Sequence, residues 1–80
     1  MEYYIGEILL VPYTFSPEGT LTCSGGLVPI AQFQALYSLL GTTYGGDGHN
    51  TFGLPNLNDA VPLLGMHYCI VYDGYYPQRP

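Results

Sequence analysis

Two cysteines and two histidines are the residues of this 80-residue chain whose side chains could do chemistry. His67 and Cys69 lie two positions apart, so on a strand they would point to the same face. With Cys23 they could supply imidazole and thiolate ligands for zinc, and either cysteine could pair with His49 or His67 as a nucleophile. A structural zinc site needs four ligands at a characteristic spacing, which is absent. A reactive thiol needs a cation or a helix N-terminus to lower its pKa, and the chain has a single basic residue. We therefore predict no catalytic residue and no metal site.

The glycine-rich segment 44–48 offers two further possibilities. It lacks the Gly-Lys-Ser/Thr ending of a phosphate loop, and it follows a predicted helix where a phosphate loop would precede one. Asp47 and Asn50 carry oxygen ligands for calcium, but their spacing does not match a calcium loop. We instead expect Gly45, Gly46 and Gly48 to allow positive φ in a tight connector, and we predict no cofactor.

The start of the chain bears on the state of the two thiols. Residues 1–4 are acidic and aromatic, where a secretory signal would be basic, so we expect synthesis in a bacterial cytoplasm without a signal peptide. Thiols stay reduced in that compartment. Buried free thiols at Cys23 and Cys69 are therefore the preferred prediction, and a disulfide between them is the alternative.

The composition indicates a surface that meets other protein chains. Nearly half of the residues (48%) are hydrophobic, nine are tyrosines, and 9% are charged, against about 25% in a typical soluble domain. A small chain with so few charges has little from which to make a polar coat, which favours self-association. The alternative is a sparingly charged monomer coated by Ser, Thr, Asn and Gln. The net charge of −5 argues against nucleic acid and anionic membranes as partners, and no apolar run is long enough for membrane insertion.

The elements that must position these residues are short. Residues 3–11 read as a strand with apolar residues on both faces, 20–23 as a second strand, and 68–72 as a third. Pro29 suits the first position of a helix, which we expect to end at Gly41 in a left-handed cap. Its apolar stripe comprises Ile30, Phe33, Leu36, Tyr37 and Leu40. Residues 51–57, with Pro55, read as extended, and 61–65 as a packed loop. We predict one small α+β domain, residues 1–80, with short strands, one central helix and long ordered loops.

Four stretches, taken together, resemble the phage tail collar domain. They are a Gly-Glu-Ile start followed by a Pro-Glu-Gly turn and a cysteine before a glycine, the long stretch PIAQFQALYSLLGTTYGGDG (29–48), TFGLPNL (51–57), and YCI with the ending GYYPQR (68–79). The sequence departs from the family pattern in three places: Gly19-Thr20 replaces a Gly-Trp pair, Ser24 replaces an aspartate, and residues 58–60 replace an Arg-Gly-Arg run. It also lacks an insertion with a His-x-His pair before the last strand, so no role of that insertion carries over.

The resemblance implies a structural role without enzymatic activity. We expect a structural and adhesive component of a phage tail fibre or phage-tail-like particle, located in that particle and forming a homotrimer. Its partners would be other tail proteins and a host surface receptor. The alternatives are a cytoplasmic protein-binding module or host-directed regulator with the same fold, and a small hydrolase. The residues that we expect at contacts between chains are Tyr3, Tyr4, Ile5, Tyr68, Tyr72, Tyr75 and Tyr76.

Overall fold

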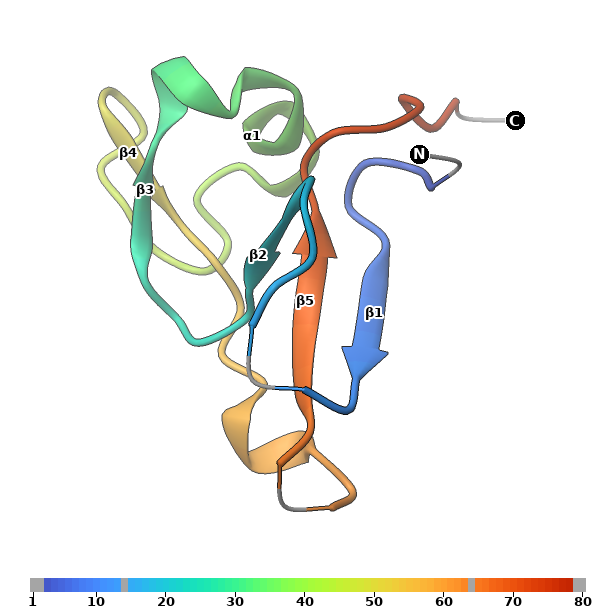
Figure 1. Ribbon diagram of the computed structural model, residues 1–80. Helices are drawn as coiled ribbons and strands as arrows, with labels where there is room; N and C mark the ends of the chain where they lie inside the picture. Colours follow the sequence, from blue (N-terminus) through green and yellow to red (C-terminus); the bar gives the residue numbers. More distant parts are fainter. Residues whose placement is uncertain (1–2, 14, 64, 79–80) are drawn as a thin grey trace.

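The computed structural model describes residues 3–13, 15–63 and 65–78. These residues form two antiparallel sheets and one α-helix (Figure 1). In the larger sheet, β5 (His67–Val71) lies between β1 (Ile8–Val11) and β2 (Thr20–Thr22). The remaining elements are β3 (Leu27–Pro29), β4 (Thr51–Gly53), α1 (Gln34–Leu40) and the 3₁₀ turns η1 (Ile30–Gln32) and η2 (Asn58–Ala60). The predicted combination of short strands and one helix is observed, with strands dominating.

The last strand of the chain occupies the centre of the larger sheet. Its register with β1 pairs Leu9 with Cys69, and its register with β2 pairs Thr22 with Cys69. Cys69, Ile70 and Val71 are at most 1% exposed, because β5 has a neighbour on each side and packing on both faces. The strand predicted at 68–72 thus lies one residue earlier than expected, and β2 likewise stops one residue short of the predicted 20–23.

One hydrophobic core joins both sheets and the helix. Phe52 of β4, Leu36 of α1 and Ile70 of β5 are almost completely buried there. The other buried members are Ile5, Cys23 and Leu54. β2, β3, β4, β5 and α1 each contribute at least one apolar side chain to this core or to its margin, which helps to hold strands of three to five residues in place.

The predicted strand at 3–11 is interrupted by a turn, so this prediction was wrong in its first half. The Glu7 N–H donates to the Tyr4 carbonyl, and Gly6 has φ 91°, which is the pattern of a type II turn. The Gly6 N–H donates to the Val71 carbonyl while the Val71 N–H donates to the Glu7 carbonyl. Gly6 and Glu7 thus both lie opposite Val71, which is the arrangement of a glycine bulge. The regular β1–β5 ladder begins after it, at Ile8. The apolar residues on both faces of this strand suggested that both faces are buried, but Ile8 and Leu10 are 41% and 38% exposed.

The predicted helix also begins later than expected. Pro29 is the last residue of β3, with an extended ψ of 134°, and the Ile30 N–H donates to the Asn50 carbonyl at the end of the antiparallel β3–β4 pair. Phe33 (φ −134°, ψ 47°) separates η1 from α1. Pairing with β4 therefore overrides the helix-starting preference of proline. At the other end, Gly41 has a positive φ of 58°, but its ψ of −143° is not that of a left-handed helical cap.

Two loops differ in how closely they are held. In the connector 42–50, Asp47 Oδ1 accepts hydrogen bonds from the N–H groups of His49, Asn50 and Thr51. Gly45, Gly46 and Gly48 all have positive φ, as predicted. Pro55, in the segment after β4, is buried as well. The loop at 61–65 is not packed as predicted, since Leu63 is 69% exposed; Leu64 lies outside the described residues.

Candidate interaction surface

The two ends of the chain lie side by side and expose four tyrosines. The Ile5 N–H donates to the Tyr75 carbonyl (2.8 Å) and the Tyr75 N–H donates to the Tyr3 carbonyl (2.9 Å), forming a parallel bridge between Tyr4 and Tyr75. The exposed fractions are 39% for Tyr3, 55% for Tyr4, 60% for Tyr75 and 49% for Tyr76. Backbone pairing of Tyr3, Tyr4 and Tyr75 therefore fixes the two chain ends against each other.

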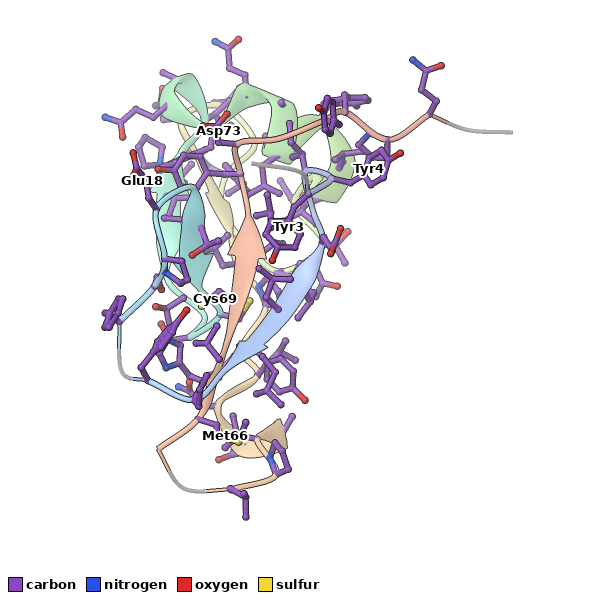
Figure 2. All side chains as sticks on the ribbon, turned by 45° about the vertical axis from the view of Figure 1, so that its right-hand side comes forward. Tyr3, Tyr4, Glu18, Met66, Cys69 and Asp73 are labelled. Carbon is purple, nitrogen blue, oxygen red and sulfur yellow. The ribbon has the colours of Figure 1, made fainter. Side chains whose placement is uncertain are left out.

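The helix α1 extends this surface. The hydroxyl groups of Ser38 and Tyr76 are 2.7 Å apart, and Leu39 is 39% exposed. A hollow of about 440 Å³ is lined by Ser38, Leu39, Tyr76, Pro77 and Gln78. Figure 2 shows Tyr4 beside the C-terminal segment, and the Tyr4 and Tyr75 ring centroids are 6.1 Å apart. We call Tyr4, Leu39, Tyr75 and Tyr76 the terminal tyrosine surface.

Four of the predicted contact residues do not belong to this surface, Tyr3 because it lines a separate hollow beside β1. Ile5 is 9% exposed and is a member of the core, so it is not available to another chain in this structure. Tyr68 and Tyr72 are partly buried and pack against the same core. The Tyr72 ring meets that of Phe33 edge to face, with the centroids 4.9 Å apart. From the sequence, Tyr68 and Tyr72 could be core or interface residues, because the alternation of a strand does not show which of its faces is covered.

A second exposed apolar region lies along β1 and was missed in the sequence. A hollow of about 400 Å³ is bounded by the β1 strand together with Tyr3, Tyr13, Pro17 and Thr20. Tyr3 lies near the upper ends of β1 and β5 in Figure 2, on the side away from Tyr4. The signal that could have found this region is the short run Ile8–Val11 between Gly6 and Pro12, because a four-residue strand bounded in this way is typical of a sheet edge.

The two thiols lie on opposite faces of the larger sheet. Cys23 is a core member whose N–H donates to the Tyr68 carbonyl. Cys69 points to the other face, where its Sγ lies 3.6 Å from the Ser16 hydroxyl. Both cysteines are free and buried, in agreement with the preferred prediction. Burial, with a smaller contribution from Cys69, raises the pKa of Cys23 from 9.0 to about 11, which disfavours the thiolate that a nucleophile or a zinc ligand needs.

The remaining candidate ligands are not brought together. In the described ranges 3–13, 15–63 and 65–78, no three His, Cys, Asp or Glu residues lie close enough to hold a metal ion. His67 Nε2 is buried without a hydrogen-bond partner among the described residues. Asp47 uses one carboxylate oxygen to hold its own connector. Within the same described ranges, no helix has the length and apolar character to cross a membrane.

The comparison with known families agrees with the resemblance found in the sequence. The model of the Phage Tail Collar Domain matches residues 6–62, more than half of the chain. The chain belongs to the phage tail collar domain family. The matched part of this collar domain runs from the turn before β1 to the end of η2 and includes the stretches 29–48 and 51–57. No curated protein is significantly similar to it. The collar domain is a structural domain of phage tails, and it is not a known enzyme family.

Proposed function

We propose that this collar domain is a structural and adhesive component of a phage tail fibre or of the tip of a phage-tail-like particle. It works as a homotrimer, joins other tail proteins, and contributes to assembly or attachment to a host surface receptor. The family supports the tail role, and the terminal tyrosine surface supports the contact between chains.

The observation that carries this proposal is the pairing of the two chain ends. Tyrosine combines a large apolar ring with a polar hydroxyl, and it is enriched where proteins meet. Here three exposed rings, those of Tyr4, Tyr75 and Tyr76, come from two segments that are about 70 residues apart in sequence but are joined by the Tyr4–Tyr75 bridge. Packing about a three-fold axis would bury these rings and would explain how a chain with 9% charged residues avoids unspecific association.

Light scattering over a dilution series tests the proposal. The wild-type chain of 8.8 kDa is expected at three times its own mass in the micromolar range. The double variant Tyr4→Ser/Tyr75→Ser keeps the backbone bridge but loses two rings, so we expect a threefold fall in mass. Tyr44→Ser is the matched control, because Tyr44 is 50% exposed but lies in the connector after α1. A monomeric wild-type chain, or a double variant that stays trimeric, would contradict the proposed trimer contact.

A further inference from the structure

The free edge of the larger sheet is β1, and its outward backbone groups can be assigned. The Val71 N–H donates to the Glu7 carbonyl, which sets the alternation of the ladder. With the register Leu9–Cys69 and Val11–His67, the backbone groups of Leu9 and Val11 face β5. The N–H and C=O groups of Ile8 and Leu10 therefore face away from the sheet, and among the described residues they make no hydrogen bond to another segment.

The opposite edge of this sheet is already protected. The Thr20 N–H and hydroxyl both donate to the Pro17 carbonyl, and the Ser24 N–H donates to the Thr22 carbonyl. Some of the outward-facing backbone groups of β2 are thus already hydrogen-bonded to neighbouring residues of the same chain. Figure 1 shows the segment that leads into β2 running beside that strand, whereas no other described segment is drawn on the outer side of β1. Proteins normally protect a sheet edge by a short strand, charge, proline or a bulge. β1 is short and is flanked by the glycine bulge and by Pro12, but Ile8–Val11 itself carries no charge, proline or bulge.

We propose that β1 pairs edge to edge with β1 of a second copy, antiparallel and about a two-fold axis. The pairing places Ile8 opposite Leu10 of the second copy, and Leu9 opposite Leu9. In this register both N–H and both C=O groups of Ile8 and Leu10 find partners, giving four hydrogen bonds. The exposed side chains of Ile8 and Leu10 become cross-strand neighbours and lose contact with water.

The distribution of charge favours a second copy in this orientation. The chain carries a net charge of −5, so two copies can approach most easily where charge is absent, and β1 is uncharged. Glu7 is the acid next to β1, and in the antiparallel register it lies opposite Val11 of the other copy. The two Glu7 side chains are then about 13 Å apart along the strands, beyond the Debye length of roughly 10 Å at 0.1 M salt. Asp73 lies on the β2 side, where its N–H is 3.4 Å from the Gly19 carbonyl.

This two-fold contact is separate from the proposed trimer contact. Strand pairing over four residues buries a small area, so we expect it at concentrations of ~0.1–1 mM. Copies held in one particle reach such effective concentrations. The β1 contact would link collar domains in pairs, whereas the terminal tyrosine surface would group them in threes.

The test uses Leu10→Pro, with Leu10→Val as the matched control. Proline removes the outward N–H of Leu10 without taking a hydrogen bond from the β1–β5 ladder, and the extended Leu9 before it is compatible with proline. At high concentration, sedimentation equilibrium should show Leu10→Pro at half the mass of the wild type, while Leu10→Val keeps the wild-type mass. Equal masses for wild type and a folded Leu10→Pro would overturn the proposal.

Amide hydrogen exchange of the wild type tests the same contact without a substitution. The Ile8 and Leu10 amides should exchange more slowly as the protein concentration rises, because only the second copy can bond them. The Leu9 and Val11 amides are internal controls, since they already donate to β5 and should change less. Exchange at Ile8 and Leu10 that is independent of concentration would refute the pairing. A threefold loss of mass in the tyrosine variant and a twofold loss in Leu10→Pro distinguish the two contacts.

Discussion

At the scale of single residues, the connector between α1 and β4 is held by one carboxylate. Asp47 Oδ1 accepts the N–H groups of His49, Asn50 and Thr51 at 2.8, 2.9 and 3.1 Å. These bonds favour the charged form and lower the pKa of Asp47 from 3.8 to about 2. The aspartate that the sequence suggested as a calcium ligand is thus engaged in shaping its own loop.

We predict that Asp47→Ala lowers the melting temperature, and that the difference depends on pH. Because the pKa is lower in the folded chain, the stabilisation by Asp47 is fully present above pH 4 and is lost as the pH falls toward 2. Thermal unfolding of the wild type and Asp47→Ala between pH 2 and pH 7 measures this. Asp47→Asn keeps an acceptor oxygen and should fall between the two. A difference that is constant from pH 7 to pH 2 would show that the charge of Asp47 has no part in it.

A second prediction concerns Gly46. Its φ is 93°, and a Cβ at this position would overlap the backbone of Phe52. Gly46→Ala should therefore lower the free energy of unfolding by about 2 kcal/mol or more, measured by urea denaturation. Gly26→Ala is the control, because a Cβ there meets no atom within 4 Å, and it should change stability by less than about 1 kcal/mol. Equal effects of the two substitutions would argue against this account.

At the scale of the elements, α1 shows why a short helix depends on its packing. Its seven residues are too few for stability in water, and it has neither an acidic residue in its first turn nor a basic one in its last. What holds it is Leu36, which is 0% exposed between the two sheets. The apolar stripe read from the sequence was right about the buried face, although Ile30 belongs to η1 and Phe33 to the break between the two helices.

We predict that Leu36→Ala lowers the free energy of unfolding by about 2–5 kcal/mol, because it leaves a cavity in the core. Leu39→Ala, on the same helix but 39% exposed, should cost less than about 1 kcal/mol. Urea denaturation followed by circular dichroism measures the free energy of unfolding of both variants. A loss at Leu39 as large as that at Leu36 would mean that the helix is held by its terminal surface and not by its core face.

At the scale of the whole molecule, the fold shields both thiols. Cys23 and Cys69 lie near each other in the sheet, but on its two faces, and both are at most 1% exposed. A pKa of about 11 in place of 9.0 lowers the thiolate fraction of Cys23 roughly a hundredfold at pH 8. This shielding disfavours Cys23 as a nucleophile.

We predict that iodoacetamide labels Cys23 at least about a hundredfold more slowly in the native chain than in urea at pH 8. Mass spectrometry of the digested protein separates Cys23 from Cys69. Because the pKa of Cys23 is raised in the fold, its contribution to stability should also be complete below pH 9 and be lost as the pH rises toward 11. Rapid labelling of native Cys23 at pH 8 would contradict the burial seen here.

The sequence by itself determined the family, the approximate places of β1, β2 and β5, and the positive φ of Gly45, Gly46 and Gly48, but it missed β3 and the turn at Gly6. The features that it determined depend on local patterns: the long stretch 29–48, the apolar run 68–72 and the glycine-rich segment 44–48. It also pointed to tyrosines as contact residues, and it left open whether Tyr68 and Tyr72 belong to the core or to a contact between chains.

The tertiary structure decided which residues face water. Periodicity shows that a strand has two apolar faces, but only long-range pairing shows that β5 lies at the centre and β1 at the edge. For the same reason Pro29 ends a strand, because its partner Thr51 lies far along the chain. The open edge of β1 and the joined chain ends both arise from contacts between residues distant in sequence, which no local pattern encodes.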